Sequence, residues 1–192
     1  MLETDRFSKI EIASLADLER WLSSHHARNE SVWLVRYKKS VPAKYVDRLD
    51  VLDVLLCFGW IDGLARKLDD DRTMQLISRR RQQAWAKSYK DRAERLMETG
   101  RMRPPGLAAI SESQSLGLWD AYSESDNLIV PDDLKNALAA HPPAEAFFSA
   151  SSPSYRRNVL RWIGIAKQDT TRRKRIDMTV TLSAKREKVP QM

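Results

Sequence analysis

The segment Leu49–Phe58 places the strongest constraint on the fold of this chain, because nearly every face of the helix that it predicts is apolar. Asp50 and Asp53 are its only charged residues. Asp47, three residues before Asp50, matches the pattern of a capping box, and Gly59 supplies the left-handed residue that commonly ends a helix. A helix with so little polar surface is expected to pack against a sheet.

Three short segments predict the strands of that sheet. Val32–Lys38 is rich in β-branched and aromatic residues and is too short for a helix. Trp60–Leu68 and Arg72–Ser78 flank the turn residues Asp69–Asp71, which is the pattern of a hairpin. Leucines at helical spacing predict another helix over Leu15–His26. We therefore expect a small antiparallel sheet with packed helices at the N-terminus.

The chain after about residue 104 predicts helices only. Proline is favoured in a first helical turn, and the carboxylates and serines beside it can satisfy the free N–H groups there. Such entries occur at Pro105, Pro131, Pro142 and Pro153. The polar segment Trp119–Asn127 is the best candidate for a linker. The fold class is thus α+β, with a three-stranded sheet in residues 1–104 and a helical region in residues 105–192.

The composition fits a folded protein of a reducing compartment. Of the 192 residues 42% are hydrophobic, which is enough for a sizeable core. Cys57 is the single cysteine, so no internal disulfide can form, and no leader pattern is seen over Met1–Ser14. The longest apolar run, Val54–Trp60, is far shorter than the ~20 residues that cross a bilayer. We expect a cytoplasmic protein without a membrane span.

Charge is distributed in blocks along the chain. The net charge is zero over residues 1–60, +5 over 61–104, −6 over 105–153 and +8 over 154–192. An acidic block between two basic ones can neutralise them within the fold. The total of +7 is therefore weaker support for a polyanionic partner than it first suggests.

One candidate pocket begins where the apolar helix passes into a strand. Trp60 and Asp62 combine a large aromatic with a carboxylate at this edge, beside a glycine that allows close approach. Arg79, Arg80 and Trp85 follow the hairpin and would line the same hollow. If the site is catalytic, Asp62 is the plausible general base, provided that burial raises its pKa. The alternative is that Asp62 satisfies backbone donors in a scaffold.

Two basic clusters predict contacts with anions or partners. Arg79–Arg81 leads into a segment where basic residues alternate with aromatics, a pattern that grips phosphates and stacks bases. A solvated helix face is the competing interpretation. The run Arg172, Arg173, Lys174 and Arg175 falls in the first turns of a helix that Asp169 or Thr170 would cap, where cations are unfavourable. Either the acidic block, through Asp132, Asp133 or Glu145, or an anionic ligand or protein partner should offset that cost.

The sequence implies no metal and no cofactor. His25, His26 and His141 have no other ligand residue at metal-site spacing, and the aspartates Asp69–Asp71 are explained by turn chemistry. Phosphate-binding glycine loops are missing, and Cys57 lies among leucines, where a thiol is usually a small hydrophobe.

Three separated motifs carry a resemblance to a known family. They are Leu56–Gly63; Gly100-Arg101-Met102 with Gly106; and Ser152–Arg157 with Leu160–Ile163, Ala166-Lys167, Thr171-Arg172 and Lys174–Ile176. In order, they resemble the YdeI/OmpD-associated family, also called bacteriocin-protection proteins, over about residues 18 to 186. The resemblance implies a bacterial protein linked to envelope regulation or bacteriocin tolerance, and no established reaction.

Three functions are compatible with these observations. The resemblance favours a cytoplasmic binding or regulatory protein linked to envelope stress or bacteriocin tolerance. A pocket formed by Trp60, Asp62 and Arg79 would instead make the chain a small-molecule-binding protein or an enzyme. Nucleic-acid binding through the basic clusters is the third, and its affinity would fall steeply with salt.

Overall fold

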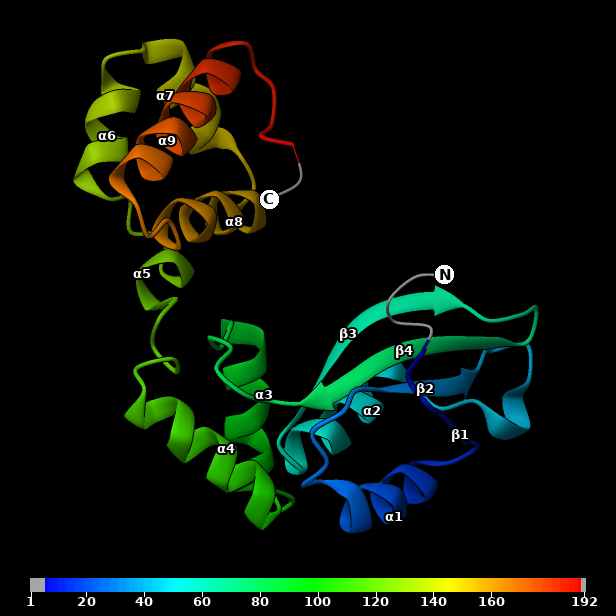
Figure 1. Ribbon diagram of the computed structural model, residues 1–192. Helices are drawn as coiled ribbons and strands as arrows, with labels where there is room; N and C mark the ends of the chain where they lie inside the picture. Colours follow the sequence, from blue (N-terminus) through cyan, green and yellow to red (C-terminus); the bar gives the residue numbers. More distant parts are fainter. Residues whose placement is uncertain (1–5, 191–192) are drawn as a thin grey trace. The chain divides into compact units, whose positions relative to one another are not determined.

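The computed structural model describes residues 6–190, which divide into an N-terminal unit that ends at Asp120 and a C-terminal unit that begins at Ala121 (Figure 1). The division falls inside the polar segment Trp119–Asn127 that the sequence favours as a linker, and not at residues 104/105. The reason is packing, because helix α4 (Pro104–Ser115) lies against α2 (Arg48–Cys57) in the N-terminal unit.

The N-terminal unit is built on a mixed sheet. Its strands are β1 (Lys9–Ile12), β2 (Val32–Tyr37), β3 (Trp60–Lys67) and β4 (Arg72–Arg79), in the order β1-β2-β4-β3. β4 is antiparallel to both of its neighbours, as the hairpin pattern predicts. The prediction of three antiparallel strands is corrected by β1, which pairs parallel to β2. The α+β class is confirmed.

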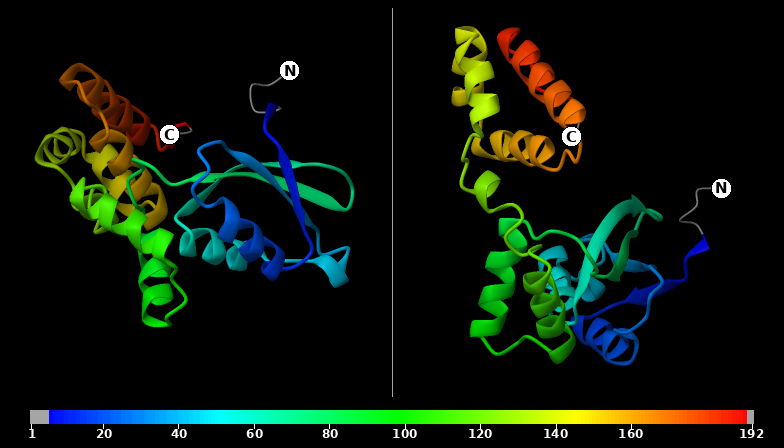
Figure 2. Two further views of the ribbon diagram at one scale, coloured as in Figure 1. Left: turned by 60° about the horizontal axis from the view of Figure 1, so that its bottom comes forward. Right: turned by 60° about the vertical axis from the view of Figure 1, so that its left-hand side comes forward.

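Helices α1 (Leu15–His25) and α2 cover one face of this sheet (Figure 2). Their N-caps form as the sequence predicts: the side chains of Ser14 and Asp47 accept hydrogen bonds from N–H groups of the first turn. A one-turn 3-10 helix, η2 (Pro42–Lys44), precedes α2. The core between sheet and helices includes Leu18, Leu22, Val32, Leu34, Val51, Leu55, Trp60 and Ile77.

Two close backbone approaches fix α4 against the end of α2. Gly59 has φ +71°, and a Cβ there would meet the carbonyl oxygen of Pro105 at 2.8 Å. Gly106 has no room for a Cβ, which would lie 2.5 Å from the carbonyl oxygen of Cys57 and 2.7 Å from that of Leu56. Glycine is therefore required on both sides of this contact.

A buried carboxylate joins α2 to α3 (Lys87–Glu98). Asp53, 3% exposed, pairs with Arg92, with Arg95 at 2.8 Å and with Arg101 at 3.4 Å. A carboxylate is tolerated at this buried position of the apolar helix α2 because three guanidinium groups compensate its negative charge.

In its described residues, the C-terminal unit contains helices and connecting loops but no strand. It contains α5 (Ser123–Asp126), α6 (Asp132–Ala139), α7 (Pro142–Ala150), α8 (Pro153–Gly164) and α9 (Asp169–Ala184). Its separate core includes Leu134, Leu138, Ala144, Phe148, Tyr155, Val159, Leu160, Ile163, Ile176 and Val180.

Two details of this unit differ from the sequence-based expectation. The segment 119–127 is not wholly irregular, because α5 forms within it. The N-cap of α9 is Gln168, not Asp169 or Thr170, and no side chain caps it. Over residues 6–190, no helix combines the length and apolar character needed to cross a bilayer.

Candidate functional site

A hollow of about 390 Å³ lies in the N-terminal unit beside the C-terminal ends of α1, α2 and β4. Arg79 and Arg80, at the end of β4, form one wall, and α4 forms another. The residues after α1 and α2 complete it. The full lining is His26, Ala27, Phe58, Gly59, Arg79, Arg80, Pro104, Pro105, Ala108, Ala109 and Glu112.

A second, more open hollow of about 580 Å³ continues from the first. Arg79, Arg80 and Glu112 line both, and Arg81 is added here together with Gln82 and Gln83. Three consecutive guanidinium groups and one carboxylate therefore border the combined space.

Arg80 is the buried member of these three arginines, with 3% of its surface exposed. Its Cζ lies 3.8 Å from the ring centroid of Trp85 and 5.7 Å from that of Tyr89. Its Nη2 donates to the carbonyl oxygens of Gln83 at 3.2 Å and Ala84 at 3.0 Å. Two carbonyl groups and two aromatic rings thus hold the guanidinium in place.

The remaining donors around Arg80 have no acceptor in the part of the chain that the structure describes. Its Nε and Nη1 are buried and make no hydrogen bond there, and the same is true of Nε1 of Trp85. Among residues 6–190 no carboxylate forms an ion pair with Arg80. Desolvation lowers the pKa of Arg80 to about 10, so the side chain is still a cation at neutral pH.

Asp62 and Trp60 lie outside the lining of both hollows. Asp62 accepts a hydrogen bond from the Tyr89 hydroxyl at 2.6 Å and another from Nε2 of Gln75 at 2.8 Å. Burial raises the pKa of Tyr89 to about 12, and the bond to Asp62 adds to the effect.

Trp60 is fully buried in the core and donates its Nε1–H to the carbonyl oxygen of His26. The structure therefore brings together Arg79 and Arg80 at the hollow, with Trp85 stacked beneath Arg80. The carboxylate that shares the hollow with them is Glu112, and not Asp62 as the sequence suggested.

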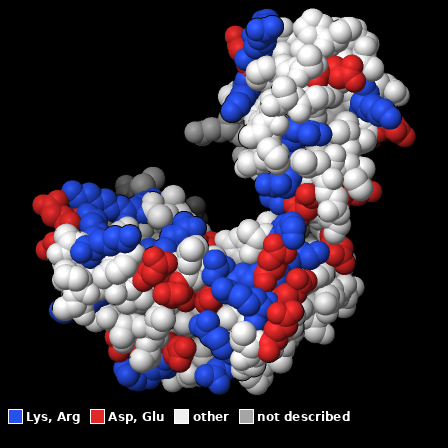
Figure 3. Space-filling view, turned by 180° about the vertical axis from the view of Figure 1, so that it is seen from behind, with Lys and Arg blue, Asp and Glu red and all other residues white. Residues whose placement is uncertain are grey.

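The basic residues that follow the arginines are mostly paired with carboxylates. Lys87 pairs with Asp91, Lys90 pairs with Asp120, and Arg92 pairs with Asp53. On the face of the N-terminal unit seen in Figure 3, basic and acidic side chains are interspersed. The alternation of basic and aromatic residues thus serves packing and ion pairs in this segment.

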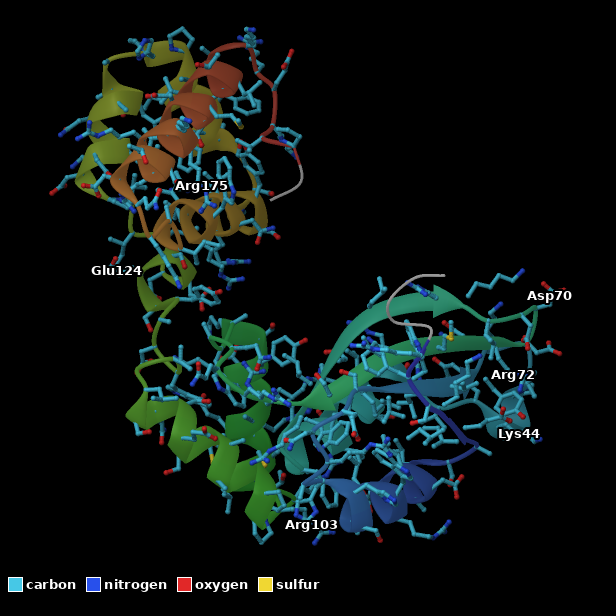
Figure 4. The ribbon with its side chains drawn as sticks, viewed as in Figure 1. Lys44, Asp70, Arg72, Arg103, Glu124 and Arg175 are labelled. Atoms are coloured by element: carbon cyan, nitrogen blue, oxygen red, sulfur yellow. The ribbon has the colours of Figure 1, made fainter. Side chains whose placement is uncertain are left out.

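The acidic block neutralises part of the second basic cluster. Arg172 binds Asp133 in a bidentate arrangement, with Nε and Nη2 at 2.6 and 2.9 Å from the carboxylate oxygens. Arg175, labelled in Figure 4, donates to the carbonyl oxygen of Trp162 and lies over that ring. Arg173 and Lys174 are exposed, and neither forms an ion pair with another described residue.

Replacing Asp133 by Asn should cost the C-terminal unit about 0.5–1 kcal/mol, because the pair is partly exposed and screened by solvent. The hydrogen bonds from Arg172 lower the pKa of Asp133, so its contribution is present above the usual value of 3.8 and is lost as the pH falls through the lowered value. Hydrogen exchange of α6 and α9 should show a difference between variant and wild type at pH 6 that begins to shrink as the pH falls below 3.8 and is lost only below the lowered pKa. A difference independent of pH would contradict this account.

Other candidate residues have structural partners. Asp69 forms the turn at the tip of the hairpin, where it accepts hydrogen bonds from the backbone of Asp71 and Arg72, close to Asp70 (Figure 4). Burial raises the pKa of Cys57. Across residues 6–190, no three His, Cys, Asp or Glu side chains are grouped so that they could hold a metal ion.

The residues of α4 were not anticipated as part of a site. Pro104, Pro105, Ala108 and Ala109 carry no chemical signal in the sequence, and only the folded contact with α2 brings them opposite Arg80. Glu112 could have been suspected only as one exposed carboxylate among many.

The two units match two different family models. Residues 10–109, more than half of the chain, match the family described as Domain of unknown function (DUF8412). The chain belongs to the DUF8412 family. The hollow beside Arg80 is formed almost wholly within the DUF8412 region, with Glu112 just beyond the matched residues.

Residues 127–186 match the family described as Bacteriocin-protection, YdeI or OmpD-Associated. This confirms the family resemblance for the motifs from Ser152 to Ile176. It also corrects the extent of the resemblance, because the motifs at Leu56–Gly63 and Gly100–Gly106 lie in the DUF8412 region. Comparison with curated proteins and with solved structures gave no match.

Proposed function

We propose that the protein is a binding protein whose N-terminal unit holds a small anion beside Arg79 and Arg80. The observation that carries this proposal is the buried guanidinium of Arg80, which has no carboxylate partner within residues 6–190 and has two nitrogens without an acceptor there. A buried cation normally has a counter-charge, because leaving charged donors unpaired costs more than leaving neutral ones. An anion in the adjoining hollow would supply it.

The neighbouring groups suit an anion better than a neutral ligand. Arg79 is exposed, lines both hollows and forms no ion pair. Arg81 is held by a hydrogen bond from Nη2 to the carbonyl oxygen of Asn29 at 3.0 Å and lines the wider hollow. Guanidinium groups bind carboxylates and phosphates through paired hydrogen bonds.

The arrangement favours binding over catalysis or nucleic-acid recognition. Asp62, the expected general base, is held by Tyr89 and Gln75 outside the hollow. Nucleic acid requires a continuous basic path with aromatic platforms. Here Trp85 is buried under Arg80, and the next basic side chains are paired with carboxylates.

A regulatory role is part of the proposal. The description of the C-terminal family names bacteriocin protection, and we propose that the anion-bound form acts in the cytoplasm on that process or on another envelope response. Deleting the gene should change survival on exposure to a bacteriocin, and a copy carrying Arg80→Met should fail to restore it. If the Arg80→Met copy restores survival, anion binding in the hollow is not needed for this role.

Replacing Arg80 by Met should weaken anion binding by about 10- to 100-fold, because a hydrogen bond to a charged group contributes about 1.5–3 kcal/mol. Titration calorimetry at low ionic strength would measure binding of inorganic phosphate, sulfate, acetate and octanoate. Since Arg80 is buried, Arg79→Gln provides a second variant at an exposed position, and it should lose affinity as well.

The matched control is Arg20→Gln, which removes an exposed guanidinium that lines neither hollow and pairs with Asp17. It should bind every anion as the wild type does. The proposal is overturned if none of the four anions binds to the wild-type protein, or if Arg80→Met and Arg79→Gln, both folded by circular dichroism, bind with unchanged affinity. Binding of mixed-sequence single-stranded DNA instead of the small anions would favour the nucleic-acid function.

A further inference from the structure

We infer that the ligand of this hollow is an organic monocarboxylate with an elongated apolar body. The inference rests on the proposed function and adds the chemical class of the ligand. It follows from what lies around the arginines: a charge balance suited to a single negative charge, and a wall of hydrocarbon that continues away from it.

The charge at the smaller hollow favours a monoanion. Arg79 and Arg80 contribute two positive charges, and Glu112 contributes one negative charge. Arg81 lines only the wider hollow and donates to the carbonyl oxygen of Asn29, so the groups at the smaller hollow have a net charge of +1, which a carboxylate balances. A phosphate monoester would bring more negative charge and would lie near the carboxylate of Glu112.

Apart from these charged groups and His26, the hollow is lined by apolar residues and Gly59. Phe58, Pro104, Pro105, Ala108 and Ala109 present rings and methyl groups to the space beside Arg80. At about 390 Å³ it has the size of ordinary small-molecule sites, which are roughly 300–1,000 Å³ and bind apolar surface around a few polar anchors. An inorganic anion would leave this hydrocarbon wall unused.

The apolar wall also continues past the first hollow. A third concavity of about 550 Å³ shares His26, Phe58, Pro104 and Pro105 with it. Its other lining residues are Glu19, Ser23 and Arg103, the last just before α4 (Figure 4). The strip from Arg80 along Phe58 and Pro105 is thus longer than a single ring, which suits an extended hydrocarbon.

The first test compares carboxylates that differ only in chain length. Acetate, butyrate, hexanoate and octanoate should bind with affinity that rises about 2- to 4-fold for each added methylene, the upper value being that of full burial. The slope should flatten once the strip is filled. Equal affinities for acetate and octanoate, both lost in Arg80→Met, would overturn this inference and leave the proposed function intact.

Two further ligands test the head group. Hexanol should bind at least tenfold more weakly than hexanoate, because it lacks the charge that Arg80 and Arg79 bind. Equal binding of hexanol would contradict the anion site itself. Phenyl phosphate binding more tightly than benzoate would show that the head group is a phosphate, and would overturn the assignment of a monocarboxylate.

Variants of α4 separate the apolar body from the head group. Ala108→Trp places a ring in the hollow from an exposed position, and it should reduce octanoate affinity about tenfold or more and by a larger factor than acetate affinity. Leu107→Trp is the control, because Leu107, the residue before Ala108, is exposed and does not line the hollow. Unchanged octanoate binding in Ala108→Trp would contradict the inferred path of the chain.

Discussion

Replacing Asp53 by Ala is expected to destabilise the N-terminal unit by about 3 kcal/mol. Breaking a buried ion pair from one side typically costs about 3–5 kcal/mol, because the remaining charge is left without compensation. The lower end applies here. Arg92 is largely buried and loses its carboxylate, whereas Arg95 and Arg101 are about half exposed and can return to water.

Tryptophan fluorescence during urea unfolding would measure this change, since five of the six tryptophans lie in the N-terminal unit. The matched control is Asp50→Ala on the same helix, where the side chain is exposed and should contribute at most about 1 kcal/mol through its place in the first turn. A double-mutant cycle with Arg92→Ala isolates the pair. Equal effects of the two aspartate substitutions would show that the buried network contributes nothing beyond an exposed charge.

Replacing Gly106 by Ala should destabilise the same unit by about 1–3 kcal/mol or more, the range for overpacking of a closely packed contact. The new Cβ would lie 2.5 Å from the carbonyl oxygen of Cys57, and backbone atoms on the end of α2 cannot rotate away as a side chain would. Helix α4 would have to move, and with it the wall that holds Pro105 and Ala108.

The same substitution at Gly164 should have the opposite sign. A Cβ there meets nothing within 4 Å, and Ala is favoured over Gly in a helix by up to about 1 kcal/mol. The stability of both variants can be compared by urea unfolding, and octanoate binding by calorimetry. We expect Gly106→Ala to lose octanoate affinity and Gly164→Ala to keep it. Unaltered stability of Gly106→Ala would refute the role given to this close approach.

Most of the fold could be predicted from local sequence patterns. The capping residues Ser14 and Asp47, the hairpin with its Asp69 turn and the proline-started helices depend on interactions within a few residues, and each forms as expected. Strand β1 was missed for the opposite reason. Its four residues alternate in polarity, but its identity depends on pairing with β2, more than twenty residues away.

The position of α4 against α2 could not be predicted from the sequence either. Helical periodicity predicts that the helix exists, but not that Gly106 lets it approach α2. That contact assigns residues 105–120 to the N-terminal unit and explains why the division lies after Asp120.

The site was predictable only in part. The three arginines after the hairpin could be seen, but their sequence does not distinguish the buried Arg80 from the exposed Arg79 and Arg81. The difference arises because carbonyl groups of the following loop and the ring of Trp85 enclose Arg80. Asp62 could not be excluded from the hollow, since its hydrogen bond from Tyr89 joins residues far apart in the chain.

If the hollow binds a ligand, the glycine contact between α2 and α4 would couple its occupancy to the folding equilibrium. Because the wall is set by main-chain atoms at Gly59 and Gly106, it cannot detach without opening the core beside it. A ligand that requires this wall then binds the native state alone, and at a free concentration one hundred times its dissociation constant it would raise the free energy of unfolding by about 2.7 kcal/mol. The protein would then be degraded more slowly in cells when its ligand is abundant.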